Sequence, residues 1–337
     1  MIESLKKEVL LANRANFDQL ALKIFRFQSE NCQPYFEFLN HLSINIDSIN
    51  SVDKIPFLPI SFFKTQIVLG KNSLAETAFE SSGTTGSNTS RHYVSDLAYY
   101  EEISLKIFEN SYGSIENYHI IAMLPSYTER GNSSLVYMIS NFIAKSKSAQ
   151  SGFYKADIEG IIQLFNQLKS DKNNRKKILL WGVTFAVLEL AESGYDFSDL
   201  KDRLIVLETG GMKGRKKELI REELYERLKS GFSLNEIHSE YGMTELLSQA
   251  YSFDGGLFHS PYSMKIVLRE INDPFAFLSQ NSVKKTGGIN VIDLANIESC
   301  SFIETNDLGQ YGEEENTFKV LGRFDNSDVR GCNLLQF

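Results

Sequence analysis

Small hydroxyl residues and glycines dominate the segment 79–92, which reads Phe-Glu-Ser-Ser-Gly-Thr-Thr-Gly-Ser-Asn-Thr-Ser-Arg-His. Glycine lets a ligand approach the backbone closely, and hydroxyls and loop N–H groups can donate hydrogen bonds to phosphate oxygens. The segment therefore predicts a phosphate-binding loop, although a loop of this composition taken alone is more typical of a surface turn. The residues assigned to phosphate binding are Ser81, Ser82, Gly83, Thr84, Thr85 and Gly86.

A second group of residues suits a flat aromatic base. Gly210 and Gly211, followed by Met212, end a short apolar strand predicted at 204–207. Their missing side chains would let a ring lie against the backbone. Tyr241, at the end of the next predicted strand, can stack on the other face of that ring, and a half-buried strand tyrosine is an equally good interpretation.

Two residues just past that strand can act on phosphate. Ligands of α/β proteins collect at the ends of strands, so the Thr244 hydroxyl can reach a phosphate there and Glu245 can bind Mg²⁺. Further along, Asp307, in a Thr-Asn-Asp-Leu-Gly segment predicted as a turn, can accept hydrogen bonds from ribose hydroxyls. Arg323, in a predicted β-turn, can bind ribose or phosphate. Aspartate also favours turns for backbone reasons, and a surface arginine is the plain alternative.

The composition is that of an ordinary globular protein. The 337 residues are 42% hydrophobic and 23% charged, with a net charge of −8, which argues against general affinity for nucleic acid or anionic membranes. The longest apolar run, 178–191, is too short to span a bilayer, and the first residues lack the form of a signal peptide. Three scattered cysteines predict neither disulfides nor a zinc site, and we expect a reducing cytoplasm.

Alternating short apolar strands and amphipathic helices predict an α/β protein with parallel layering. Helices are predicted within 2–31 and at 34–42, 96–110, 133–145, 157–169, 183–193 and 214–229, and strands at 118–123, 177–181 and 204–207. After about 235 short strands dominate, at 237–241, 262–268, 288–293 and 318–322, which predicts a smaller C-terminal β subdomain. The segment 55–64 is predicted as extended because of its two prolines.

The expected organisation is one continuous body with a short tail. The body spans 1–321 and divides into a helical region 1–50, an α/β part 51–235 and a β-rich part 236–321. The tail spans 322–337.

The motifs in this order resemble the nucleotide-binding motifs of the acyl-adenylate-forming superfamily. They are Ser-Gly-Thr-Thr-Gly at 82–86, the glycines at 210–211, Tyr-Gly-Met-Thr-Glu at 241–245, which includes Gly242, then Asp307 and Gly-Arg-Phe-Asp at 322–325. From about residue 50 onwards the chain is similar to LuxE-type acyl-protein synthetases of bacterial fatty-acid reductase complexes. The phosphate loop and the Tyr-Gly-Met-Thr-Glu motif are the specific parts of this resemblance.

The resemblance implies a two-step reaction that uses ATP and Mg²⁺. A fatty or other carboxylic acid attacks the α-phosphate to give an acyl-adenylate and pyrophosphate, and a protein cysteine then accepts the acyl group as a thioester. In that family the acceptor lies near the C-terminus, as Cys332 does here. A reductase is the implied partner, and assembly into oligomers is compatible with the sequence.

One departure from the larger superfamily concerns the end of the chain. Enzymes that load coenzyme A usually carry a mobile domain after the Gly-Arg-x-Asp turn, including a lysine that assists adenylation, and this sequence stops 12 residues after Asp325. Lys64, Arg91 and Lys213 are the candidates to replace that lysine. The alternatives are an acyl or aryl coenzyme A ligase with a shortened C-terminus and a nucleotide-binding adaptor without catalysis.

Overall fold

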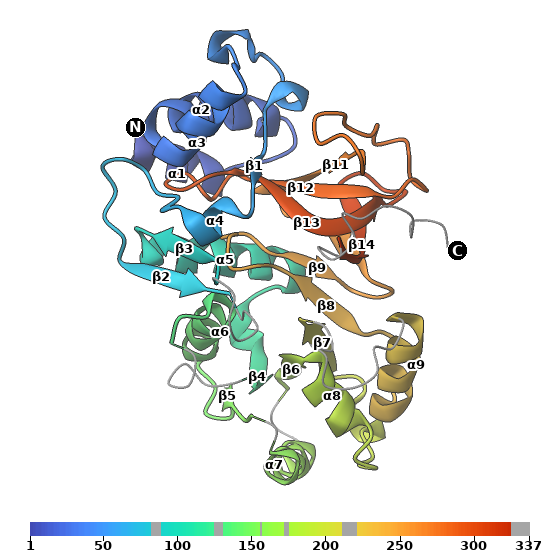
Figure 1. Cartoon of the computed structure of the whole chain (residues 1–337). Helices are drawn as coiled ribbons and strands as arrows, with labels where there is room; N and C mark the ends of the chain where they lie inside the picture. Colours follow the sequence, from blue (N-terminus) through green and yellow to red (C-terminus); the bar gives the residue numbers. More distant parts are fainter. Residues whose placement is uncertain (82–88, 125–130, 156, 172–174, 211–220, 325–337) are drawn as a thin grey trace.

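The computed structural model describes residues 1–81, 89–124, 131–155, 157–171, 175–210 and 221–324. Three helices begin the chain: α1 (Ile2–Leu10), α2 (Phe17–Asn31) and α3 (Gln33–His41). Their apolar sides are buried, as the helical spacing of hydrophobic residues predicts. Figure 1 shows them at one end of the molecule, above the strands β11 to β14.

A long mixed sheet runs through the described part of the chain, in the order β11-β12-β13-β14-β10-β9-β8-β7-β6-β4-β5. The parallel strands are β4 (Tyr118–Met123), β5 (Gly152–Phe153), β6 (Lys177–Val183), β7 (Leu204–Thr209) and β8 (His238–Tyr241). The antiparallel strands are β9 (Ala250–Ser252), β10 (Leu257–His259), β11 (Met264–Arg269), β12 (Gly287–Asp293), β13 (Phe302–Tyr311) and β14 (Thr317–Arg323). The predicted α/β class is confirmed, and the sheet continues across residue 236 into the β-rich part.

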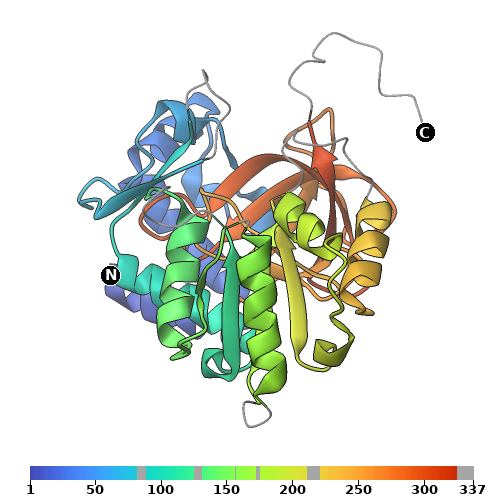
Figure 2. The same ribbon diagram turned by 90° about the horizontal axis from the view of Figure 1, so that it is seen from below.

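Helices cover both faces of the parallel strands (Figure 2). On one face Trp181 of β6 contacts Phe108 of α5 (Leu97–Tyr112) and Phe142 of α6 (Ser134–Lys145). On the other face Glu208 of β7 bonds to side chains of α8 (Thr184–Ala191) and α9 (Arg221–Phe232). Helix α7 (Ile158–Ser170) completes this part. Side chains of adjacent residues in a strand point to opposite faces, so each strand can serve both sides.

A separate hairpin carries the predicted phosphate loop. Strand β2 (Thr77–Glu80) pairs antiparallel with β3 (Arg91–Val94), and the segment 82–88 between them lies outside the described residues. Asp96 caps helix α5, because its carboxylate accepts a 2.8 Å hydrogen bond from the Tyr99 N–H. This hairpin has no counterpart among the predicted elements.

Three local predictions are wrong. The segment 55–64 is not extended throughout: only β1 (Leu58–Pro59) pairs with β13, and Lys64 lies in the short helix α4 (Phe62–Thr65). Asp307 lies inside β13 rather than in a turn, and Arg323 lies in β14 rather than in a β-turn. Pairing between the two strands overrides the local turn preference of Thr-Asn-Asp-Leu-Gly.

Within the described residues, none of the helices is both long and apolar enough to cross a membrane.

Candidate active site

The two ends of the predicted phosphate loop meet at Ser81 and Ser90. The Ser81 N–H bonds to the Ser90 carbonyl at 3.0 Å, and the Ser90 N–H bonds back to the Ser81 hydroxyl at 3.1 Å. The Ser90 hydroxyl in turn hydrogen-bonds the carboxylate of Glu245. The base of the loop is therefore joined directly to the Tyr-Gly-Met-Thr-Glu segment, as expected if both act on the same phosphates.

Glu245 and its neighbour Thr244 occupy different environments. Glu245 is 5% exposed, and burial raises the pKa of its carboxyl group, while the Ser90 bond and the charge of Arg323 oppose that rise. Thr244 is half-buried, and its carbonyl accepts a hydrogen bond from His92 Nδ1 at 2.9 Å. The Asn296 amide donates to the Glu245 carbonyl at 2.8 Å. These bonds hold the backbone and leave the Thr244 hydroxyl free of any bond to other described residues.

Three predicted nucleotide residues from three strands meet around one carboxylate. The Tyr241 hydroxyl donates to Asp307 at 2.9 Å, and Arg323 Nε donates to the other Asp307 oxygen at 2.9 Å. Asp307 is 5% exposed, whereas the Arg323 side chain is 76% exposed. Burial, and then the Asp307 charge, raise the pKa of Tyr241 well above its ordinary value, so its hydroxyl keeps its proton.

Tyr241 is more buried than a ring that stacks on a base would need to be. Its ring packs against Phe258 at 5.8 Å and Phe318 at 5.3 Å between centroids, and the residue is 8% exposed. Gly210, directly after β7, is exposed and has a positive φ of 83°, a conformation that favours glycine. The other predicted residues of this group, Gly211 and Met212, lie outside the described residues.

The segment after Tyr241 is held by a buried carboxylate that the sequence analysis did not single out. Asp293, fully buried at the end of β12, accepts hydrogen bonds from the backbone N–H groups of Leu247, Ser248 and Ala295 and from the Ser248 hydroxyl, at 2.6–3.1 Å. Burial raises the pKa of Asp293, and these bonds oppose the rise. The loop 242–249 is therefore fixed before any ligand binds.

His92 also has a structural position. Both ring nitrogens are bonded, Nδ1 to the Thr244 carbonyl and Nε2 to the Ser299 hydroxyl at 3.0 Å. Burial lowers the pKa of His92 to about 4, so the ring is neutral at pH 7. His92 supports the Thr244 backbone and cannot itself contact a phosphate.

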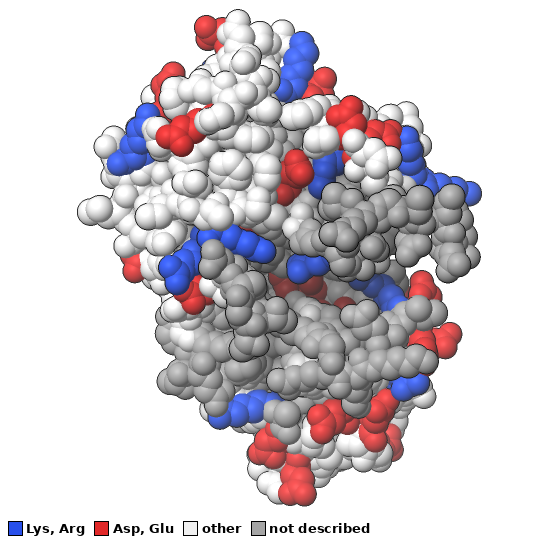
Figure 3. All heavy atoms as spheres, in the orientation of Figure 1, with Lys and Arg blue, Asp and Glu red and all other residues white. Residues whose placement is uncertain are grey.

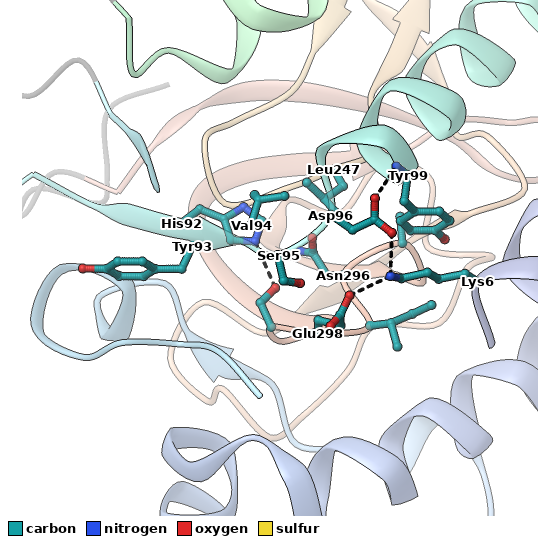
Figure 4. Close-up of a pocket in the computed structure, with 13 residues that line it drawn as sticks. Lys6, His92, Tyr93, Val94, Ser95, Asp96, Tyr99, Leu247, Asn296 and Glu298 are labelled. Carbon is teal, nitrogen blue, oxygen red and sulfur yellow. Dashed lines mark hydrogen bonds and ion pairs between the residues drawn. The ribbon is translucent and has the colours of Figure 1, made fainter. Parts of the chain in front are cut away.

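A small pocket behind this support is closed by ion pairs (Figure 4). Lys6 of α1 lies 2.7 Å from Asp96 and 2.8 Å from Glu298, and its side chain is 10% exposed. Burial alone would lower the pKa of Lys6, but the bonds to the two carboxylates outweigh this effect and raise it. The cluster fixes α1 against α5 and the segment 295–299, and its role is structural.

Beside Tyr241, the opposite face of β8 carries another carboxylate absent from the predictions. Glu240 Oε2 accepts a 2.6 Å hydrogen bond from the Thr209 hydroxyl, and Glu240 is half-buried. Burial raises the pKa of Glu240 to about 7; the Thr209 bond lowers it and the charge of Glu208 raises it. The strand His-Ser-Glu-Tyr has no local pattern that singles out Glu240, so its position becomes clear only from the pairing of β8 with its neighbours.

Some of the remaining predicted site residues lie within the described part of the chain, and the others lie outside it. Gly242 follows Tyr241 and is exposed, and a Cβ atom there would lie 2.2 Å from Glu240 Oε1, so a larger residue would displace the Glu240 carboxylate. The residues Ser82, Gly83, Thr84, Thr85, Gly86 and Cys332, together with Lys213, lie outside the described residues. Of the other two candidates for the missing lysine, Arg91 pairs with Glu80 at 2.9 Å, and Lys64 is exposed.

The molecule is hollowed between its upper and lower parts in the view of Figure 3. Basic side chains gather around this hollow and acidic side chains lie within it. Among the described residues, no group of three or more His, Cys, Asp or Glu side chains is placed to hold a metal ion by itself. A single carboxylate such as Glu245 fits Mg²⁺ that arrives on phosphates, because Mg²⁺ keeps several waters and takes only one or two protein ligands.

Solved structures with a similar fold include two ATP-bound proteins and an acyl acid amido synthetase. Two are ATP-bound RpMatB–BxBclM chimeras, B3 and B1, with 16% and 15% identity and TM-scores of 0.54 and 0.55; the match covers 74% of this chain and 48% of each of those chains. A third is the AtGH3.15 acyl acid amido synthetase in complex with 2,4-DB, with 13% identity and a TM-score of 0.51, covering 96% of this chain and 70% of that one. At these identities the likeness establishes the fold. The chain spans about half the length of the two chimeras.

No curated protein sequence matches the chain significantly. A family model does match, and it is that of the acyl-protein synthetase LuxE, over residues 12–336. Nearly the whole chain is included, with the hairpin, the Tyr241–Asp307–Arg323 group and the Thr244–Glu245 segment inside it. The chain therefore belongs to the LuxE acyl-protein synthetase family.

Proposed function

We propose that the protein uses ATP to convert a carboxylic acid, such as a fatty acid, into an acyl-adenylate, and then transfers the acyl group to a protein cysteine. The observation that best supports this is the meeting of Tyr241, Asp307 and Arg323 from β8, β13 and β14. Membership of the LuxE family and the adenylate-forming fold point the same way. The acyl thioester would then be available to a reductase partner.

In this proposal Asp307 binds the ribose. Its carboxylate holds the Tyr241 hydroxyl and the Arg323 guanidinium on separate oxygens, and each oxygen still has a free lone pair for a ribose hydroxyl. Arg323 is exposed, so it can also turn towards a phosphate. The enzyme needs no general base, because the acid substrate is already ionised at pH 7 and aligned charges do most of the work.

Glu245 is the residue that we assign to Mg²⁺. The metal would neutralise phosphate charge during attack on the α-phosphate. Glu245 is suited to this role because its carboxylate already contacts Ser90 at the base of the phosphate loop and is fixed by backbone bonds on both sides. Its raised pKa means that a nearby cation would favour the charged form that binds metal.

The acceptor thiol that we propose is Cys332. The two described cysteines are unsuitable: Cys32 is 1% exposed and burial raises the pKa of its thiol to about 11, and Cys300 is completely buried with its thiol bonded to the Phe302 carbonyl. A protonated, inaccessible thiol is a poor nucleophile. The tail that contains Cys332 is the remaining source of a protein thiol in this chain.

The decisive experiment follows both steps in the full-length chain. Acid-dependent ATP–pyrophosphate exchange tests activation, and labelled acid with ATP should leave a hydroxylamine-sensitive label on the protein. Glu245→Ala should reduce exchange by roughly a hundredfold, as expected for loss of a metal ligand. Exchange at the normal rate in this variant would contradict the role of Glu245.

Cysteine variants test the second step separately. Cys332→Ser should abolish the thioester label and leave exchange intact, while the matched change Cys32→Ser should keep both. A label retained in Cys332→Ser rejects that acceptor. AMP release that depends on coenzyme A and is unaffected by Cys332→Ser would instead identify a coenzyme A ligase.

A further inference from the structure

Strand β8 presents different chemistry on its two faces. Tyr241 points towards β10, β13 and β14, where it contacts Phe258, Phe318 and Asp307. Glu240, the residue before it, must point to the opposite face, because strand residues alternate. That face is the one covered by α5, since Tyr251, the register partner of Glu240 on β9, contacts Phe108 and Tyr112 of α5.

The Glu240 carboxylate is only partly satisfied. Thr209 donates to Oε2 at 2.6 Å, and the described residues offer Oε1 neither a hydrogen bond nor an ion pair. Oε1 lies towards Gly242, where a side chain would collide with it, and Gly242 is exposed. The free oxygen is therefore directed to the end of β8, the position where strands of α/β proteins meet their ligands.

The surroundings of this oxygen are polar as well as aromatic. The charge of Glu208 on β7 raises the pKa of Glu240. The charge of Glu240 in turn raises the pKa of three tyrosines, which are Tyr100 and Tyr112 of α5 and Tyr251 of β9. The Gln249 amide, next to Gly242 in space, is committed to the Ser104 carbonyl at 2.9 Å and to the Tyr251 hydroxyl. A second polar atom on this face, Nε1 of the fully buried Trp181, also lacks a hydrogen-bond partner among the described residues.

A bound acid must place its carboxylate beside the nucleotide and its chain elsewhere. If Tyr241 and Asp307 hold the nucleotide on one face of β8, the other face at the same strand end is the space left for the chain of the acid. Glu240 is a charged group on that side, at the strand end. An alkyl chain there would shield from water a carboxylate to which the described residues donate one hydrogen bond, and this is costly.

We propose that Glu240 selects the acid substrate by accepting a hydrogen bond from a donor group, a hydroxyl or an ammonium, carried on the acid's own chain. The preferred acid is then a hydroxy or amino acid rather than an unsubstituted fatty acid. This inference rests on the proposed function and specifies its substrate class. Burial raises the pKa of Glu240 to about 7, which agrees with a carboxylate that lacks a full set of hydrogen-bond donors.

The test compares matched acids in the pyrophosphate-exchange assay with the full-length chain. For each chain length, the unsubstituted acid is compared with its hydroxy and amino derivatives, substituted at each carbon in turn. The wild type should use at least one polar acid with a kcat/KM roughly tenfold or more above that of its unsubstituted parent. Glu240→Leu should remove this preference, measured as the ratio of the two values.

A conservative variant distinguishes a hydroxyl donor from an ammonium donor on the acid, and it is less disruptive to the fold than Glu240→Leu. Glu240→Gln keeps an acceptor oxygen without charge, so it should retain a preference for a hydroxyl and lose a preference for an ammonium. The matched control Glu236→Gln, at an exposed carboxylate just before β8, should leave every ratio unchanged.

The outcomes distinguish this inference from the proposed function. Exchange that is fastest with unsubstituted fatty acids, or a polar preference that survives in Glu240→Leu, overturns the role of Glu240 while acid activation stands. Exchange with none of the acids rejects acid activation and the inference together.

Discussion

Asp293, which is fully buried, and Glu240, which is half-buried, both lie beside the loop 242–249 but differ in how many hydrogen bonds the protein donates to them. Asp293 accepts four hydrogen bonds from the backbone and the side chain of that loop and of the segment after β12. Glu240 accepts one, from Thr209. A carboxylate whose lone pairs are filled by the protein supports the fold, whereas one that is left open at a strand end is available to a ligand. The first should matter for stability and the second for specificity.

Replacing Asp293 should have the largest effect on stability. Asp293→Ala leaves three backbone N–H groups without their acceptor in a buried place, which should lower the free energy of unfolding by about 3 kcal/mol or more. Urea denaturation followed by circular dichroism measures this. Asp202→Ala, at an exposed aspartate, is the control and should change little. A stable Asp293→Ala protein would show that the loop does not depend on this carboxylate.

Replacing Asp307, which binds Tyr241 and Arg323, should have the next largest effect, and we expect it in the use of ATP rather than in stability. Asp307→Ala removes the acceptor shared by Tyr241 and Arg323 and should reduce kcat/KM for ATP in pyrophosphate exchange by roughly a hundredfold. Tyr241→Phe removes only the hydroxyl and should cost less. If Tyr241→Phe were the more damaging change, Asp307 would not be the direct ligand of the nucleotide.

The positions of the motifs and of several strands along the chain could be predicted from the sequence, because each depends on local composition. Ser81, Thr244 and Glu245 belong to one connected region, and the strands at 118–123, 177–181 and 204–207 form as expected. Continuous apolar runs between helices specify buried parallel strands without any knowledge of the partner strand.

Features that depend on distant pairing were not predictable. Asp307 was assigned to a turn because Thr-Asn-Asp-Leu-Gly has turn composition, but pairing of Asp307 with Arg323 places both in strands. Asp293 and His92 gain their roles from backbone groups 45 and 152 positions away, which no local pattern encodes. Glu240 was overlooked because a single acidic residue has no meaning until its neighbours across the sheet are known.

Removing the charge of Glu240 should raise the free energy of unfolding, whereas removing the Asp293 carboxylate should lower it. The folded protein keeps a proton on Glu240 up to about pH 7, whereas the unfolded chain releases it near 4.5. The stability linked to this proton is therefore present below pH 4.5 and is lost as the pH rises through about 7. Glu240→Gln stays neutral, so its free energy of unfolding should match that of the wild type in acid and exceed it by roughly 3 kcal/mol above pH 7.

Urea denaturation of both proteins across this pH range measures the difference directly. Comparing the two proteins cancels other titrating groups, including His92, whose depressed pKa makes the fold weaken as the pH falls from 6.5 towards 4. A difference that stays constant with pH would mean that the pKa of Glu240 is the same in the folded and the unfolded protein, which would contradict the effect of burial on this carboxyl group.

Replacing Thr209 should have the smallest effect on the free energy of unfolding, and it tests the hydrogen bond to Glu240 specifically. Thr209→Val keeps the shape of the side chain and removes the only described donor to Glu240, so the charged carboxylate loses its one hydrogen bond. The free energy of unfolding should fall by about 1 kcal/mol more above pH 7 than in acid, because the protonated carboxyl group needs that donor less. Thr65→Val, at an exposed position in α4, is the matched control. An equal loss at all pH values would show that Thr209 acts by packing, and Glu240 would then be even less supported by the protein than its single bond suggests.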